Sequence, residues 1–386
     1  MEKAPSFKEA VSGGTPTANL RLRYETADQS GKESADAATA RLRLGYVTGA
    51  FYGLQAGVEF ETTGAADVDS YNAAGVMGDP EKSVIADPES TEVNQLFLKY
   101  VLGESEAIVG RQRIVLDNAR FVGDVGWRQN NQTYDALTFK TTALPDTELS
   151  YSYVDKVIRI FGSESEGVQN HFTSDSHLLN AKYMGLPVKL AAYAYLLDLE
   201  NAKALSTDTF GASLSGKTVI SETSSLAYYL EGAYQESGDS NPEVYEVYYY
   251  HGTLTGSYKK VAGILGYEVL GSDTAESGDN KSFTTPLATL HKFNGWADVF
   301  LATPPEGLQD FYVGLSAPLP ASMIFKAFYH DFSSDKDSMS YGDEIDLLLV
   351  APVPGIGKAI AKYANYSADE YGVDTERFSI ELNIAF

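Results

Sequence analysis

The sequence predicts an all-β protein, a closed antiparallel transmembrane β-barrel of about eighteen strands. Three observations predict this fold. Segments of about ten residues alternate between apolar and polar side chains along most of the chain, which is the pattern of a strand with different surroundings on its two faces. Short turns rich in Gly, Pro and Ser alternate with longer polar loops. The chain also ends on an alternating strand, which the first strand can pair with to close the sheet.

The composition restricts the alternatives. The 386 residues include 34 Gly and 26 Tyr, and the sequence has no run of eighteen apolar residues, which excludes a transmembrane helix but not membrane strands. The lack of cysteine excludes disulfides and fits an exported protein. A net charge of -24 argues against nucleic acid as a partner. The first residues lack the apolar core of a signal peptide, so if the protein is exported, either Met1 is an added start residue or the export signal was removed before it.

The strands follow in order from the N-terminus. In the first, at 17–25, Leu20, Leu22 and Tyr24 share one face, opposite arginine and glutamate side chains. The next two strands, at 38–47 and 51–61, repeat this alternation around a short TGA turn. The other strands are expected at 92–101, 106–114, 132–141, 146–155, 176–184, 188–198, 208–214, 221–235, 243–256, 258–271, 308–316, 322–331, 343–350, 358–368 and 376–386. We place the turn after 208–214 at SGKT and the turn after 243–256 at a Gly-Ser pair.

The lengths of the connections between strands indicate which rim of the barrel is extracellular and which is periplasmic. The long loops, at 62–91, 115–131, 157–174 and 272–307, all fall on one rim, as extracellular loops do, and the short turns fall on the periplasmic rim. A strand at 296–302 would make the strand count odd, so we assign 272–307 to one loop. The resulting domains are a periplasmic N-terminal segment, 1–16, and a single barrel, 17–386. We expect the loops 115–131 and 272–307 to fold into the lumen.

The last strand ends on an aromatic residue. Phe378, Ile380, Leu382, Ile384 and Phe386 share one face, which we assign to lipid. Phe386 would then lie in the aromatic belt at the periplasmic interface. A terminal aromatic residue of this kind is also read by the barrel-assembly machinery of outer membranes, which we therefore expect as a partner.

Basic residues gather on the polar face of neighbouring strands, which we assign to the lumen. They are Arg21, Arg23, Arg41, Arg43, Lys99, Arg111 and Arg113. A stripe of guanidinium groups along the pore can pass an anion from one partner to the next. The alternative is that these side chains only pair with Glu25, Glu59 and Glu61 and hold the wall rigid.

Two loops carry further candidate pore residues. Val122, Val125 and Trp127 make the loop 115–131 too apolar for a solvated loop, so it either folds inward or packs on the rim. An inward fold narrows the pore and presents Arg120, Arg128 and Gln129 to the solute. On the second loop, we expect His291, Lys292 and Trp296 to lie in the pore.

Two segments carry a resemblance to a known family. GRQRIVLDNARFVGDVGWRQNNQTYDALTF and LHKFNGWADVFLATPPEGLQDFYVGL, together with the terminal strand, resemble the alginate-export-type porins of the outer membrane. The resemblance implies an eighteen-stranded, monomeric barrel through which a solute diffuses, with a basic lumen at Arg111, Arg113, Arg120 and Arg128. This sequence departs from that pattern because its wall strands also carry acidic residues. They are Glu25, Glu59, Glu268, Glu344, Asp346 and Glu381.

These patterns predict a porin of the bacterial outer membrane, for passive diffusion of small hydrophilic solutes, anions included. The alternatives are a closed structural or adhesive barrel and a barrel enzyme, which the lack of a GxSxG motif disfavours. No cofactor is expected, and the five histidines lack metal-ligand spacing. The expected partners are outer-membrane lipid and lipopolysaccharide, small solutes or ions and the assembly machinery. We favour a monomer and leave a trimer as the alternative.

Overall fold

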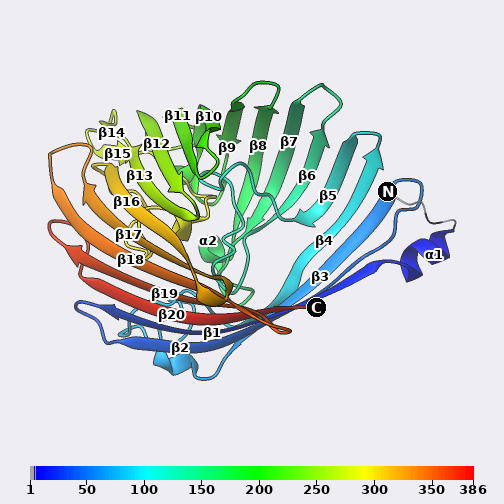
Figure 1. The fold of residues 1–386 in the computed structure, drawn as a ribbon, viewed down its shortest axis with the longest axis horizontal. Helices are drawn as coiled ribbons and strands as arrows, with labels where there is room; N and C mark the ends of the chain where they lie inside the picture. Colours follow the sequence, from blue (N-terminus) through cyan, green and yellow to red (C-terminus); the bar gives the residue numbers. More distant parts are fainter. Residues whose placement is uncertain (1–3, 5) are drawn as a thin grey trace.

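The strands of the computed structural model close into one antiparallel barrel (Figure 1). The structure describes residue 4 and residues 6–386. Eighteen strands form the barrel sheet, each hydrogen-bonded to its neighbours in chain order, and the last strand pairs with the first. The predicted closed barrel and its strand number are therefore confirmed. Both termini lie at the right of Figure 1.

The barrel strands are β1 (Thr15–Gln29), β2 (Ala35–Val47), β3 (Leu54–Ala65), β4 (Ser90–Leu102), β5 (Ser105–Gln112), β6 (Thr133–Thr141), β7 (Thr147–Ile158), β8 (His171–Tyr183), β9 (Lys189–Leu197), β10 (Thr207–Ser221), β11 (Ser224–Ser237), β12 (Glu246–Tyr258), β13 (Val261–Leu270), β16 (Leu308–Leu319), β17 (Met323–Ser333), β18 (Ser340–Val353), β19 (Gly357–Ala368) and β20 (Thr375–Ala385). A separate hairpin, β14 (Ser272–Thr274) and β15 (Asn280–Ser282), lies in the longest loop. The helices are α1 (Phe7–Ser12) and α2 (Gly167–Asn170), with 3-10 turns η1 (Val68–Ser70), η2 (Lys203–Leu205), η3 (Leu290–Lys292) and η4 (Pro320–Ser322). Among the described residues, these helices are all too short to cross a membrane.

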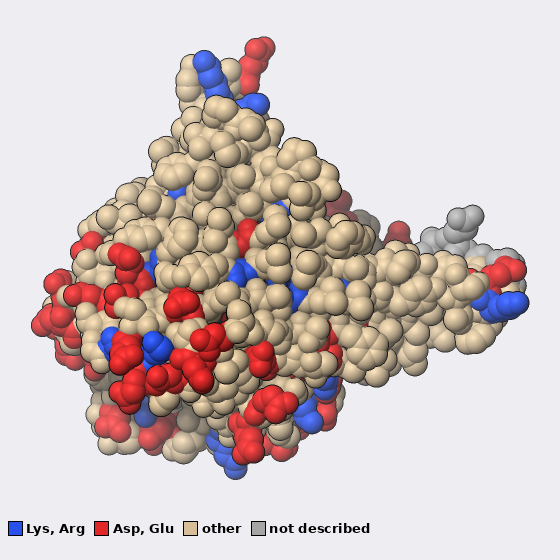
Figure 2. All heavy atoms as spheres, turned by 90° about the horizontal axis from the view of Figure 1, so that it is seen from below, with Lys and Arg blue, Asp and Glu red and all other residues tan. Residues whose placement is uncertain are grey.

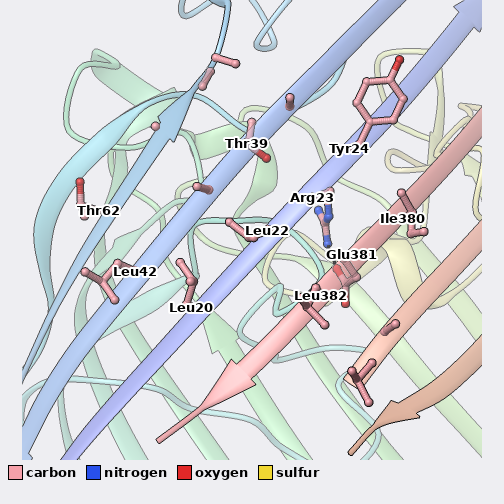
Figure 3. A pocket seen from close by; sticks show the side chains of 17 residues that line it. Leu20, Leu22, Arg23, Tyr24, Thr39, Leu42, Thr62, Ile380, Glu381 and Leu382 are labelled. Carbon is pink, nitrogen blue, oxygen red and sulfur yellow. Dashed lines mark hydrogen bonds and ion pairs between the residues drawn. The ribbon is translucent and has the colours of Figure 1, made fainter. Parts of the chain in front are cut away.

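The seam between β1 and β20 closes the barrel as the alternation predicts. The register pairs Leu20 with Ile384 and Arg23 with Glu381. Figure 3 shows Arg23 and Glu381 beside each other, among apolar side chains of the two strands such as Leu22 and Leu382. The Arg23 and Glu381 side chains are buried inside the barrel, whereas Leu22 is exposed on its outer wall. Apolar residues therefore face outward here, where a membrane barrel meets lipid.

The outer wall carries a band of exposed apolar side chains. They include Leu44, Phe60, Leu98, Leu137, Leu230, Leu254, Leu265, Val313, Ile345 and Ile380. Figure 2 shows Asp and Glu side chains crowded at one end of the molecule, while the broad surface next to that end is nearly free of charge. This is the surface division that a membrane-embedded barrel requires.

Two predicted turns are wrong. The β10–β11 hairpin turns at 222–223 and not at SGKT, and the β12–β13 hairpin turns at 259–260 and not at the Gly-Ser pair. Gly216 of SGKT stays within the ladder because the ring of its cross-strand partner Tyr228 covers it and occupies the space of a side chain. Gly256 likewise stays in the ladder, opposite Gly263. Both hairpins consequently extend beyond their predicted turns.

The N-terminal boundary is also shifted. β1 begins at Thr15, before the predicted 17, and α1 precedes it. Residues 1–3 and 5 of the predicted periplasmic segment lie outside the described residues. The assignment of 1–16 to the periplasm stays a prediction.

A packed core lies inside the barrel. Two loop segments, 113–132 and 283–303, fill much of the lumen, and we call them together the plug. Phe121 of the first segment packs against Phe283 of the second and against Tyr193 and Tyr249 of the wall, with ring centroids 5.1–5.8 Å apart. Backbone hydrogen bonds join the segments, including Gly123 N to Leu287 O at 2.8 Å. The plug is thus a folded unit and not a pair of independent loops.

Candidate functional site

Arginines on β1 and β2 hold the backbone of the plug. Arg21 donates from Nη1 to the carbonyl oxygens of Trp127 and Arg128, each at 3.0 Å, and from Nη2 to that of Gly126 at 3.1 Å. Arg41 and Arg43 both donate to the carbonyl oxygen of Gln129, at 3.3 and 3.2 Å. Arg21, Arg41 and Arg43 of the predicted basic stripe therefore face the interior of the barrel, and most of their donors bind the plug.

Arg21 and Arg41 are direct cross-strand partners. Two like charges directly opposite each other destabilise a sheet, so this pair needs acceptors. The carbonyl oxygens of 126–129 supply them, as does the Oδ1 atom of Asn19 for Arg41. The side chain of Gln129, predicted to face the solute, is fully buried and donates to Thr39 Oγ1 at 2.8 Å.

Next to these arginine contacts, buried charged side chains form a network of ion pairs. Arg23 donates to Asp87 Oδ2 at 3.1 Å and to Glu381 Oε2 at 2.6 Å, and Arg128 lies 3.2 Å from Glu25 and 2.6 Å from Asp298. Burial by itself raises the pKa of the Asp87 carboxyl, but Arg23 and Arg128 outweigh burial and hold that pKa below its ordinary value. Asp87 therefore stays ionised and binds a third loop, 66–89, to the plug.

Arg120 anchors the plug to the opposite wall. Its Nε atom lies 2.6 Å from Glu268 Oε1 on β13, and its other nitrogens donate to Thr285 Oγ1 at 3.1 Å and Asn294 Oδ1 at 3.2 Å. The Arg120 side chain is only 1% exposed. It thus joins both plug segments to the wall, and its guanidinium is directed at protein groups.

Both tryptophans of the chain enclose one lysine of the wall. Lys362 Nζ, on β19, lies 4.1 Å from the Trp127 ring centroid and 4.0 Å from that of Trp296. It also lies 2.6 Å from His291 Nε2, while His291 Nδ1 is 2.7 Å from Asp298 Oδ1. A lysine ammonium has only donors, so His291 Nε2 accepts and Nδ1–H donates to Asp298. We call Lys362 and these rings the lysine clamp.

Acidification is expected to loosen the plug. Burial lowers the pKa of His291 to about 3, although Asp298 acts in the opposite direction. A released loop regains the ordinary histidine pKa near 6.5, so between about pH 6.5 and 3 only the released state binds the proton. The stability of the packed plug therefore falls as the pH falls through this range. Single-channel recordings at pH 7 and pH 4 should show more current fluctuation at pH 4, and His291→Gln should reduce the difference between the two pH values.

The structure places Arg111 on the outer face, contrary to the lumen position predicted from the sequence. Its register partners are Leu96 on β4 and Asp135 on β6, and Leu96 and the neighbouring Val109 are exposed on the outer wall. Arg111 forms a two-point ion pair with Asp135, at 2.8 and 3.0 Å. The reason is that Arg111 shares the face of the exposed Val109, whereas Gly110 and the buried Gln112 take the inward positions of β5.

Other predicted basic residues keep contact with the open part of the lumen. Arg113 is 31% exposed and lies 2.7 Å from Glu59, and Lys99 is 27% exposed and lies 2.8 Å from Glu106. Lys292, at the edge of the plug, donates to the carbonyl oxygen of Asn118 at 2.6 Å. Lys99, Arg113 and Lys292 are therefore only partly covered by protein.

The far wall, from β11 to β18, carries acidic side chains. They are Glu231, Glu268, Asp310, Glu344 and Asp346, all buried. Glu344 accepts hydrogen bonds from the backbone nitrogens of Trp296 and Ala297, at 2.5 and 2.7 Å. Gly295 precedes them with a φ of 81°, and a Cβ there would collide with the Glu344 carboxylate. The acidic wall thus fixes the second plug segment, opposite the basic stripe.

Several residues of this site were missed in the sequence. Lys362 follows the alternation of the strand 358–368 on the same face as the buried Ala364 and Tyr366, so its inward direction could have been predicted. Asp87 and Asp298 lie in loops, where no periodicity exists to mark them. Asp87 pairs with Arg23 and Asp298 with Arg128, and both arginines lie far from their partners in the chain.

Comparisons with known proteins agree with this architecture. The sequence profile of a family described as "Alginate export" matches residues 15–270. The fold is similar to Acinetobacter baumannii OccAB3, with a TM-score of 0.72, 13% identity and coverage of 97% of this chain and 100% of the other. For A. baumannii OccAB2 these values are 0.73, 17%, 98% and 99%. For the outer membrane protein OpdK of Pseudomonas aeruginosa they are 0.71, 14%, 96% and 99%. No curated protein matches in sequence.

Proposed function

The chain belongs to the alginate-export family, and from this premise we propose that it is an outer-membrane porin for passive diffusion of small hydrophilic solutes, including anions. A diffusion channel selects by the width of its constriction and by the electric field inside it, without a covalent step. The proposal rests mainly on one observation, a closed barrel whose lumen contains the plug. A closed wall surrounds two packed loop segments, and charged side chains remain exposed beside them.

The constriction is proposed to lie between the basic stripe and the plug. Arg113 and Lys99 would contact anions directly, since both are partly exposed. Arg21, Arg23, Arg41, Arg43, Arg120 and Arg128 would act mainly by holding the plug, and thereby setting the pore width. The acidic far wall would give the pore a transverse field.

Replacing Arg113 by alanine should lower the anion-to-cation permeability ratio by about two- to fivefold, because removing one wall charge at contact distance from an ion costs about 1 kcal/mol or less in water. Reversal potentials in planar bilayers under a salt gradient measure the ratio. Arg111→Ala is the matched control, since it removes the same charge two residues earlier but on the outer face. The control should leave the ratio unchanged.

Two results would contradict the proposal. Equal effects of the two substitutions would show that Arg113 does not act from the lumen. An absence of current steps at all voltages would favour the alternative, a barrel closed by its own loops with a structural or adhesive role.

The proposed partners follow from the location. Outer-membrane lipid surrounds the barrel, and we propose that lipopolysaccharide contacts the charged loop rim and that the assembly machinery reads the terminal strand ending in Phe386. The barrel is proposed to act as a monomer, because one chain supplies all eighteen strands and the whole plug.

A further inference from the structure

A cavity of about 350 Å³ lies between the plug and the far wall of the barrel. Residues of β11, β12, β13, β16 and β17 form its wall side, and the plug residues Asn118 and 292–296 form the other side. Its volume is near the lower end of the range of small-molecule sites, which is roughly 300–1,000 Å³. None of the residues that line the cavity belongs to the basic stripe, so the cavity and the stripe are distinct.

Aromatic rings supply the broad surfaces of this cavity. Phe293 and Trp296 come from the plug, and Tyr312 and Phe328 come from the wall. Trp296 and Phe328 meet edge to face, with centroids 5.7 Å apart. Flat aromatic surfaces carry negative charge on their faces and attract the slightly positive C–H groups of a ring stacked on them.

Neutral polar groups complete the lining. Asn118, Tyr229, Thr253 and His251 all border the cavity. His251 is 8% exposed, and its Nε2 atom lies 2.9 Å from Tyr312 Oη. Its Nδ1 atom has no hydrogen-bond partner among the described residues. That atom is enclosed by protein, so the hydrogen-bonding groups available to a ligand are the hydroxyls of Tyr229, Thr253 and Tyr312 and the amide of Asn118.

The carboxylates that line the cavity are already hydrogen-bonded by protein groups. Glu268 is paired with Arg120 at 2.6 Å, and Asp310 accepts from His330 Nδ1 at 2.8 Å. Asn294 Nδ2 donates to both carboxylates, at 2.7 and 3.2 Å. Because these carboxylates are occupied by protein donors, and the Lys292 ammonium at the cavity edge donates to the carbonyl oxygen of Asn118 at 2.6 Å, we take the cavity to favour an uncharged ligand.

From these features we propose that the cavity is a binding subsite for a neutral sugar ring of pyranose size. Such a ring presents C–H groups on its faces and hydroxyls around its edge, which matches aromatic surfaces bordered by neutral hydrogen-bonding groups. The inference deepens the proposed porin function by naming one solute class. A weak subsite across the plug from the constriction would hold that solute inside the barrel and still release it.

Intrinsic fluorescence gives a direct test. The sequence has two tryptophans, so Trp127→Phe leaves Trp296, in the cavity wall, as the only reporter. Methyl α-glucoside should change the Trp296 emission saturably in detergent-solubilised protein.

Phe328→Ala and His251→Leu, in the unsubstituted background, should each weaken sugar binding measured by equilibrium dialysis about five- to thirtyfold. Because the dialysis variants keep Trp127, this measurement does not depend on the folding of the Trp127→Phe variant.

Matched controls make the test specific. Phe311→Ala, at the outward position next to Tyr312 on β16, and His177→Leu, at an outward position of the distant β8, are the same substitutions outside the cavity, and they should not alter sugar binding. Tighter binding of glucuronate or benzyl alcohol than of the glucoside, no saturable binding, or equal losses in the controls would overturn the proposal. Sugar binding to a protein that gives no channel current would support the subsite and contradict the porin, so the two proposals fail independently.

Discussion

Arg120→Ala is expected to destabilise the packed plug by about 3–5 kcal/mol and to increase single-channel conductance. The substitution leaves the Glu268 carboxylate buried without its cation, and breaking one side of a buried ion pair typically costs this much. It also removes the donors to Thr285 and Asn294, which join the two plug segments to each other. Hydrogen exchange of the plug segments measures the stability, and planar-bilayer recording measures the conductance.

A second variant separates the ion pair from a general loss of packing. Arg120→Ala combined with Glu268→Gln removes both charges, so it should restore a substantial part of the lost stability, because no unpaired carboxylate remains. Arg159→Ala is the control for the loss of an arginine that does not bind a carboxylate, since Arg159 lies after β7, packs on Phe161 and Phe172 and donates to the carbonyl oxygen of Val168. Equal exchange rates in Arg120→Ala and the unsubstituted protein would show that the pair does not hold the plug.

The barrel wall was predictable because membrane and lumen impose one local rule on each strand. Alternation placed Leu22 and Ile380 outside and Arg23 and Glu381 inside, and the pairing of the first and last strands followed from it. The alternation also holds at Arg111, but there the charged residue does not mark the lumen face. Arg111 lies on the outer face with Val109, and the buried Gln112 is the inward polar residue of β5.

The interior of the barrel was only partly predictable. Trp127 and Val122 marked the first plug segment as too apolar for solvent, and Val122 is buried in the plug core. The sequence could not show that Arg21 and Arg41 would bind backbone carbonyls, because a carbonyl leaves no residue-specific pattern. The cavity beside His251 depends on five strands and the plug together, so its shape is a property of the folded chain alone.

Lys362→Met is expected to release the plug from β19 by breaking the lysine clamp. Methionine retains an apolar chain of similar length but has no charge for the faces of Trp127 and Trp296, and it cannot donate to His291. Cation–π contacts are worth up to about 2 kcal/mol each when shielded from water, so two of them contribute about 2–4 kcal/mol. The equilibrium between a packed and a released plug should therefore shift roughly a hundredfold toward release.

Single-channel recordings distinguish release of the plug from a simple change of wall charge. Removing one lumen cation alone shifts ion selectivity at constant conductance, whereas a released plug adds long-lived states of higher conductance, because the pore itself widens. Lys358→Met is the matched control, since Lys358 is on the same strand but exposed near the β18–β19 turn, away from both tryptophans. Identical recordings from the two variants would mean that the plug is held by the arginine contacts alone and that the two rings around Lys362 do not contribute to its closure.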